Sequence, residues 1–180
     1  LDNTVVNVAL PSIQEDLGTT ISGLEWIVNG YTLSFAVLLA VGGRLGDIFG
    51  RRKMFVVGVI VFTFASTTAG FAPNDFALVA SRVLQGAGAA FMMPGTLSII
   101  TDAFPAHERG KAIGTWAGVS ALALAIGPVL GGFLTEYVSW RAIFYINLPV
   151  GILAVLAALF IVRESRDTTV GRRVDLLGVG

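Results

Sequence analysis

The sequence predicts an all-α, polytopic membrane protein whose helices form a six-helix transmembrane bundle. Hydrophobic residues make up 54% of the 180 positions and charged residues 13%, and the mean hydropathy is +0.79. Soluble domains carry about 25% charged residues, so a soluble fold of this size would leave much of its surface apolar. Long apolar runs separate the charges, and the connections between the runs alternate between basic and non-basic. These three observations predict a chain that crosses a membrane repeatedly.

Six apolar runs define the predicted spans. A helix needs about 20 apolar residues to cross the hydrocarbon core of a bilayer. Five runs meet this need with no charge other than Arg82, and they cover residues 26–43, 54–71, 76–100, 112–134 and 142–162. A sixth run, residues 4–13, is short and predicts a first helix that begins before Leu1. We therefore expect a bundle over residues 1–162 with a truncated first helix, and a cytoplasmic linker and the start of a further helix over residues 163–180.

The basic residues predict the orientation of the bundle. Arg141 is the one basic residue in the first, third and fifth connections. The other connections hold ten of the twelve Lys and Arg: Arg44, Arg51, Arg52, Lys53, Arg109, Lys111, Arg163, Arg166, Arg172 and Arg173. Because basic loops stay on the cytoplasmic side of a membrane, the first helix is predicted to run from inside to outside.

Several classes of function receive no support from the sequence. The net charge is zero, so nothing indicates nucleic-acid binding. The chain has no cysteine, and its one histidine, His107, is interpreted as a solvated loop residue, so no metal site is predicted. No nucleophile with a base is apparent, and Gly86 and Gly88 follow an arginine in an apolar helix rather than a strand, so we expect neither an enzyme nor a nucleotide site.

Two ionisable residues are predicted at membrane depth, where a charge costs at least about 2.5 kcal/mol. At 1.5 Å per residue, Asp2 lies roughly 16 Å and Arg82 roughly 9 Å below the outer surface. One interpretation is a carboxylate whose protonation is coupled to transport and is tuned by the guanidinium. The alternatives are a static ion pair, or Asp2 lining water at a helix end. Gln85, one turn beyond Arg82, is a candidate to bind a substrate, a water or the arginine, or to serve packing alone.

Glycines and prolines inside the spans predict close packing and bends. Glycine recurs every four residues in three sets, which predicts that a neighbouring backbone approaches each set closely. The sets are Gly42, Gly46 and Gly50; Gly114 and Gly118; and Gly127 and Gly131. Pro128 and Pro149 each leave a carbonyl unpaired and are expected to bend their helices.

The most specific motif lies between the second and third spans. Residues 43–53 read Gly-Arg-Leu-Gly-Asp-Ile-Phe-Gly-Arg-Arg-Lys. Binding to anionic lipid explains the four cations but explains neither the carboxylate nor the glycine spacing. The string resembles the loop signature of the major facilitator superfamily, although Ile48 stands where that signature often has a basic residue. The resemblance implies that this loop holds the two halves of a transporter together on the cytoplasmic side, through Gly43, Asp47, Gly50, Arg51 and Arg52.

Further motifs resemble the fourteen-helix drug:proton antiporters of the EmrB/QacA type. Residues 1–11 are similar to their first helix, and residues 82–90 to the fourth-helix motif of the superfamily. The resemblance implies proton coupling through Asp2 and Arg82, with Gln85 and Asn7 as candidate residues of a substrate cavity. A fifth-helix motif implies a bend that governs opening, with Ala123 replacing a usual glycine; its matching residues are Gly114, Gly118, Gly127, Pro128, Gly131 and Gly132.

Residues 139–151 resemble the stretch that opens the sixth helix of these exporters. They also fit an outer interfacial belt, with Trp140 and Tyr145 at the level of the lipid headgroups and Arg141 reaching into water.

The resemblance implies the N-terminal half of a proton-coupled exporter of lipophilic, cationic drugs in a bacterial cytoplasmic membrane. The bundle would consist of two inverted three-helix repeats that pack against a C-terminal half around a central cavity. The implied partners are membrane lipid and a small-molecule substrate, and the energy source is a proton gradient with no cofactor. Alternatives are an exporter or facilitator of a metabolite, lipid or amino acid, and a non-transporting membrane sensor. The substrate and the choice between twelve and fourteen helices stay open.

Overall fold

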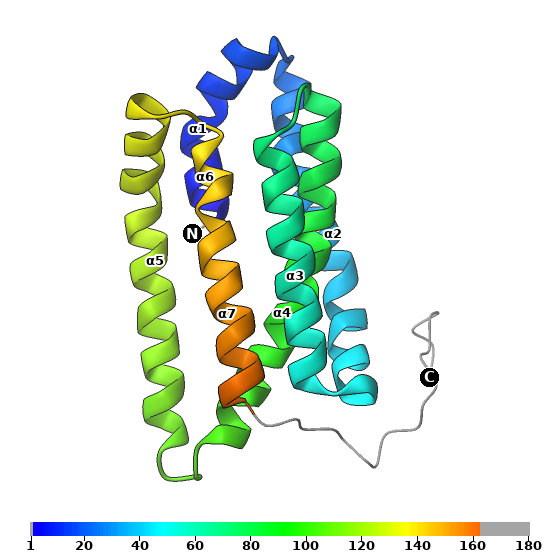
Figure 1. Cartoon of the computed structure of the whole chain (residues 1–180), viewed down its shortest axis with the longest axis vertical. Helices are drawn as coiled ribbons and strands as arrows, with labels where there is room; N and C mark the ends of the chain where they lie inside the picture. The colour runs from blue at the N-terminus through cyan, green and yellow to red at the C-terminus, as the bar shows by residue number, and fades with distance from the viewer. Residues whose placement is uncertain (1, 163–180) are drawn as a thin grey trace.

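The computed structural model describes residues 2–162, which form a bundle of helices lying side by side (Figure 1). Within this range the helices are α1 (Asp2–Leu17), α2 (Ile21–Phe49), α3 (Arg51–Gly70), α4 (Asp75–Ala103), α5 (Arg109–Tyr137), α6 (Ala142–Tyr145) and α7 (Asn147–Ile161). Five segments are long and apolar enough to cross a membrane, with Ala142–Ile161 taken as one, and α1 is a shorter helix of 16 residues. The predicted all-helical bundle is confirmed. The predicted linker at 163–180 lies outside the described residues.

The connections alternate between the two ends of the bundle, as the charge pattern predicts. Figure 1 shows the α1–α2, α3–α4 and α5–α6 connections at one end. The α2–α3 and α4–α5 connections and the end of α7 lie at the other. The second end carries Arg51 and Arg52 at the start of α3 and Arg109 and Lys111 at the start of α5. The basic residues predict that this end faces the cytoplasm, so we call it the cytoplasmic end and the opposite end the outer end.

The helices extend beyond the predicted apolar runs because a helix continues into the polar layer at the membrane surface. α1 passes through Pro11 and ends at Leu17, whereas the sequence predicted an exit near Ile13. α2 begins five residues before the predicted run, at Ile21, where the Thr20 hydroxyl accepts a hydrogen bond from Gly23 N at 3.2 Å. Such caps satisfy amide groups that have no partner within the first turn of the helix.

The sixth span is one membrane-spanning segment, Ala142–Ile161, as predicted. Its helix is interrupted at one residue, Ile146, between α6 and α7, where the backbone keeps helical angles (φ −61°, ψ −25°), and we call this position the α6–α7 break. Pro149 explains the break, because proline has no N–H to donate to the carbonyl four residues earlier, that of Tyr145. The hydroxyl of Ser66 on α3 donates to the carbonyl of Phe144 at 2.8 Å. A side chain from a neighbouring helix therefore contacts the backbone at the α6–α7 break.

Small residues allow α2, α3 and α4 to pack closely. A Cβ at Gly42 of α2 would lie 2.3 Å from the carbonyl oxygen of Ala90 on α4. A Cβ at Gly88 of α4 would lie 2.6 Å from the amide of Phe62 on α3. Real Cβ atoms do not approach backbone this closely, so glycine is required at both contacts. The predicted close approach at Gly42 is confirmed.

Other members of the glycine sets do not make the predicted contacts. Among the described residues, no atom outside the helix's own backbone lies within 4 Å of a Cβ placed at Gly46, Gly114 or Gly118. For Gly114 and Gly118 the prediction of a closely packed neighbour is wrong in this part of the chain. The reason is that α5 packs on α1 through its C-terminal half, where a Cβ at Gly131 would lie 3.1 Å from the Cα of Val5.

A cluster at the outer end ties three connections together. Trp140 donates from Nε1 to Asp16 Oδ2 at 3.0 Å, and the Arg141 guanidinium contacts the same carboxylate and also the carbonyl of Ala72. Arg141 lies 4.3 Å from the centre of the Trp140 ring. We call Asp16, Ala72, Trp140 and Arg141 the outer clasp. The hydrogen bonds from Arg141 and Trp140 hold the pKa of Asp16 below its usual value of 3.8.

The side chain of Trp140 is enclosed by the bundle. The side chain of Trp140 is 4% exposed and packs edge-on against Phe144. Its indole therefore lies inside the outer end of the bundle, where Asp16 supplies a partner for the indole N–H, and its level relative to the headgroups stays a prediction. The main apolar core gathers in the same half of the bundle and contains Val5, Val6, Ala9, Ile13, Ile27, Ala69, Ala72, Leu78, Trp140, Ile143 and Phe144.

Candidate functional site

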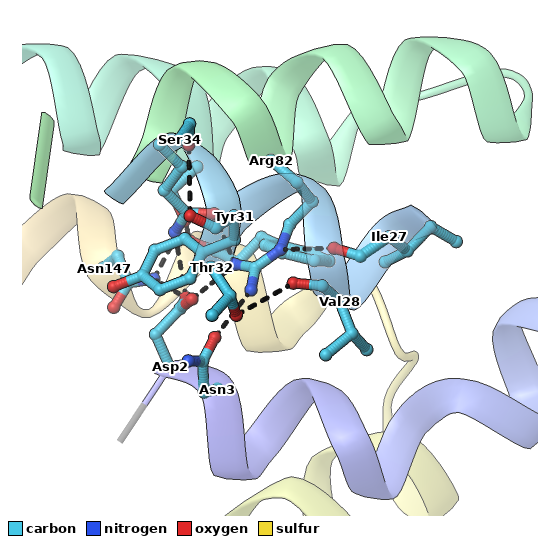
Figure 2. A network of polar contacts seen from close by, with 12 residues as sticks. Asp2, Asn3, Ile27, Val28, Tyr31, Thr32, Ser34, Arg82 and Asn147 are labelled. Atoms are coloured by element: carbon cyan, nitrogen blue, oxygen red, sulfur yellow. Dashed lines mark hydrogen bonds and ion pairs between the residues drawn. The ribbon is translucent and has the colours of Figure 1, made fainter. Parts of the chain in front are cut away.

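Arg82 is the centre of a polar network inside the bundle (Figure 2). Its side chain is fully buried, and each part of the guanidinium has a partner. Nε donates to the carbonyl of Ile27 on α2 at 3.2 Å, and Nη2 donates to Asn3 Oδ1 on α1 at 2.9 Å. Nη1 contacts the carboxylate of Asp2 and donates to Gln85 Oε1 at 2.7 Å. Three helices thus fix the orientation of one planar cation.

An aromatic ring covers the guanidinium. The Cζ of Arg82 lies 4.4 Å from the centre of the Tyr31 ring on α2. The negative face of an aromatic ring attracts a cation, and the attraction is stronger where water is excluded. Tyr31 therefore helps to compensate a charge that would be costly at membrane depth.

Asp2 is surrounded by donors from two further positions. Its Oδ1 accepts from Gln85 Nε2 at 2.9 Å and from Asn147 Nδ2 at 3.1 Å, while Oδ2 contacts Arg82. The side chain is 11% exposed. Burial of the pair is tolerated because both partners are hydrogen-bonded.

The sequence predicted the depth and the pairing of Asp2, Arg82 and Gln85, and the structure brings all three together. It also adds Asn3, Tyr31, Ser66 and Asn147, which sequence reasoning missed. Neutral polar residues carry little signal in an apolar run, although Asn147 stands two residues before Pro149 and Ser66 lies inside a span. The positions of Asn147 and Ser66 were the only features of the sequence that could have pointed to their part in the polar network.

The two candidate cavity residues differ in exposure. Gln85 is fully buried, and its amide binds both Asp2 and Arg82. Asn7 is exposed and lies four residues beyond Asn3 on α1, so both asparagines lie on the same side of that helix. The structure therefore places Gln85 in the polar network and Asn7 on an open helix face, and their roles toward a substrate stay predictions.

The cytoplasmic loop motif forms a tight turn between α2 and α3. Gly50 ends α2 and precedes α3 with φ +108°, a conformation that side chains other than glycine rarely adopt. Asp47 forms an ion pair with Arg51 across this turn.

Arg52 Nη1 donates to the carbonyl of Val162 at 3.0 Å, and this hydrogen bond connects the start of α3 to the end of α7. A Cβ at Gly43 would meet Pro94 of α4 at 3.7 Å, an ordinary contact.

The fifth-helix motif packs against the helix that carries Asp2. Gly127 and Gly131 of α5 are buried, and a Cβ at Gly131 would lie 3.0 to 3.1 Å from atoms of Val5. Gly132 lies farther away, with its Cβ position 3.9 Å from Val8. Pro128 lies inside α5 and removes one helix hydrogen bond. The motif therefore sets how closely α5 approaches α1.

Comparison with profiles of known protein families shows which family the chain belongs to. The profile of the Major Facilitator Superfamily matches residues 1–176. The chain belongs to the major facilitator superfamily. With this family and the spans described above, it is a multi-pass membrane protein of a transporter fold.

Curated relatives within the superfamily are resistance and export proteins. The tetracenomycin C resistance and export protein of Streptomyces glaucescens is 41% identical over 179 residues, covering 99% of this chain and 33% of that protein. The puromycin resistance protein pur8 of Streptomyces alboniger is 45% identical over 181 residues, covering 99% and 35%. The multidrug resistance protein Stp of Mycobacterium tuberculosis is 41% identical over 179 residues, covering 99% and 33%. The chain spans about a third of the length of these relatives.

A solved structure shares the fold of this major facilitator chain. It is the inward-open conformation of the xylose transporter XylE from E. coli, with a TM-score of 0.71 and 17% sequence identity. The match covers 91% of this chain and 45% of that chain. At this identity the likeness shows the arrangement of the helices alone.

Proposed function

We propose that the protein containing this chain exports lipophilic, cationic small molecules across the cytoplasmic membrane of a bacterium in exchange for protons. The observation that carries the proposal is the carboxylate of Asp2, held against the buried guanidinium of Arg82 within the apolar bundle. Ionisable groups at this depth are costly and mark ion and proton pathways. The named activities of the relatives, resistance and export, support the direction of transport.

The exchange follows from competition between a proton and a substrate. When Asp2 is ionised, its charge balances that of Arg82, and a cation can bind near the carboxylate. When Asp2 is protonated, the charge of Arg82 is no longer balanced, and its repulsion releases the cation. Both events act on one set of conformational states, so an inward proton gradient drives export. No cofactor is needed, because the gradient supplies the energy.

The remaining motifs fit the opening and closing of such a carrier. The turn at Asp47, Gly50 and Arg51 would hold the cytoplasmic side together with a second half of the transporter. The α5 motif around Pro128 and Gly131 would govern the movement of α5 against α1. A second half and the surrounding lipid are the proposed partners.

Transport by the full-length protein in sealed vesicles tests the proposal. We expect a pH gradient to drive efflux of a fluorescent lipophilic cation, and Asp2→Asn to abolish the efflux. Asp102→Asn is the matched control, because Asp102 is exposed near the cytoplasmic end of α4. Flux that ignores the gradient would favour a facilitator, and flux of a metabolite but of no cation would favour another cargo. The absence of any flux would favour a sensor.

A further inference from the structure

A directed chain of hydrogen bonds joins Asp2 to the α6–α7 break. Asn147 uses Nδ2 twice, donating to Asp2 Oδ1 at 3.1 Å and to Ser66 Oγ at 2.9 Å. Ser66 has one hydroxyl hydrogen, which it donates to the carbonyl of Phe144 at 2.8 Å, so its oxygen is free to accept from Asn147. Each bond in the chain therefore fixes the direction of the next.

Asn147 lies directly beside the one-residue interruption of the sixth span. It is the first residue of α7, directly after Ile146, which separates α6 from α7. Pro149 leaves the Tyr145 carbonyl without its usual helix partner. The hydrogen bond from Ser66 to the neighbouring carbonyl of Phe144 therefore meets the span where one backbone hydrogen bond is missing.

A proton added to Asp2 disturbs this arrangement. An ionised carboxylate only accepts hydrogen bonds, whereas a protonated one also donates. Both oxygens of Asp2 already face donors, from Arg82, Gln85 and Asn147. Adding a hydrogen to either oxygen therefore forces one donor to withdraw or turn.

Asn147 is the donor that turns most easily. Arg82 is held by further bonds to Ile27 and Asn3, and Gln85 is bound to Arg82 through its own oxygen. Rotation of the Asn147 amide would present its oxygen to the protonated carboxyl group. That oxygen would then also face Ser66, whose hydroxyl would turn from Phe144 toward it.

We propose that Asn147 is a positioning residue that couples the charge on Asp2 to the α6–α7 break through Ser66. The inference rests on the proposed role of Asp2 as the group that gains and loses the proton. The charged or titratable groups that face Asp2 within the described network are Arg82 from α4 and Tyr31 from α2. α3 and α7 contribute the neutral side chains Ser66 and Asn147, so the relay itself carries no charge.

Amide hydrogen exchange of the full-length protein in lipid tests the coupling without substrate or gradient. The proteins compared are the wild type, Asp2→Asn as a mimic of the neutral carboxyl group, Ser66→Ala, and the double variant. The readout is exchange in peptides covering residues 142–150, which reports local opening. Thr67→Ala is the matched control, because Thr67 follows Ser66 in α3 but donates to Thr63 of its own helix at 2.8 Å.

The coupling predicts a non-additive result. Loss of one hydrogen bond at the break corresponds to about tenfold faster exchange, which we expect in Asp2→Asn and in Ser66→Ala. In the Ser66→Ala background, Asp2→Asn should add less than about twofold, because the link is already broken. Asn147→Leu should behave like Ser66→Ala, and Thr67→Ala like the wild type.

Two results would overturn the proposal: no change at residues 142–150 in Asp2→Asn, or full and independent effects of Asp2→Asn and Ser66→Ala. If Asn147→Leu does not fold, the comparison of wild type, Asp2→Asn, Ser66→Ala and the double variant still tests the coupling. Because the readout needs no transport, it is separate from the vesicle measurement that decides the proposed function.

Discussion

Arg82 and Asp2 lie 80 positions apart in the sequence, yet the guanidinium of one contacts the carboxylate of the other inside the bundle. Removing one member of a buried pair leaves the other charge without its partner. We expect Arg82→Met to lower the free energy of unfolding by about 3–5 kcal/mol. Thermal unfolding of the full-length protein in detergent measures this loss.

The double variant is the control for that experiment. Asp2→Asn combined with Arg82→Met removes both charges, so it should recover at least half of the loss. A double variant no more stable than Arg82→Met would show that the two charges do not compensate each other.

Gly131 should tolerate no side chain without cost. A Cβ there would lie 3.0 Å from Val5 Cγ1 and 3.1 Å from its Cα and carbonyl oxygen. We expect Gly131→Ala to destabilise the protein by about 1–3 kcal/mol through crowding of α1 against α5. Gly118→Ala on the same helix should be neutral or gain up to about 1 kcal/mol, since its Cβ position has open space among the described residues. Equal stabilities of the two variants would refute the packing described for the motif.

Gly50 should be required by its backbone conformation. Its φ of +108° is strained for a residue with a side chain, so Gly50→Ala should cost about 1–3 kcal/mol. Gly46→Ala is the matched control, because Gly46 lies one turn earlier in helical conformation with no neighbour within 4 Å of a Cβ in the described residues. Chemical denaturation compares the pair. The prediction fails if Gly46→Ala is the more damaging of the two.

Asp16 should make stability depend on pH in the acidic range. Its folded-state pKa lies below 3.8, chiefly because Arg141 and then Trp140 bind the carboxylate. A lowered pKa gives stability that is fully present above the unfolded value and is lost as the pH falls through the folded value. The wild type should therefore unfold at a higher temperature than Asp16→Asn at neutral pH.

The difference between these two proteins should be constant above about pH 5 and should shrink as the pH falls through the folded-state pKa of Asp16, which lies below 3.8. Glu15→Gln is the control, since Glu15 is the exposed neighbour of Asp16 and no part of the outer clasp. A difference that persists unchanged through the acidic range would contradict the role given to the clasp.

Hydropathy and charge predicted the helices and their alternation because a membrane imposes both properties on every span. The same information predicted that Asp2 and Arg82 would approach each other, since two charges at similar depth favour pairing. It could not predict helix ends, because a helix continues past its apolar run wherever caps such as Thr20 satisfy its backbone. It predicted the sixth span as one segment, which is confirmed, but it could not place the one-residue interruption at Ile146.

Contacts between neutral polar side chains could not be predicted from the sequence either. Asn147 and Ser66 are ordinary residues in their own helices, and only the packing of α7 on α3 makes them neighbours of Asp2. Likewise, the hydrogen bond from the Trp140 indole to Asp16 joins residues 124 positions apart and could not be predicted from the sequence.

Proton release on substrate binding tests the central claim most directly. The full-length protein, in weakly buffered detergent solution, is mixed with tetraphenylphosphonium while the pH is recorded. The account predicts that the wild type releases protons as the cation binds, and that Asp2→Asn binds the cation without releasing them. Equal proton release from both proteins, or binding to the wild type with no release at any pH tested, would contradict an exchange of proton for substrate at Asp2.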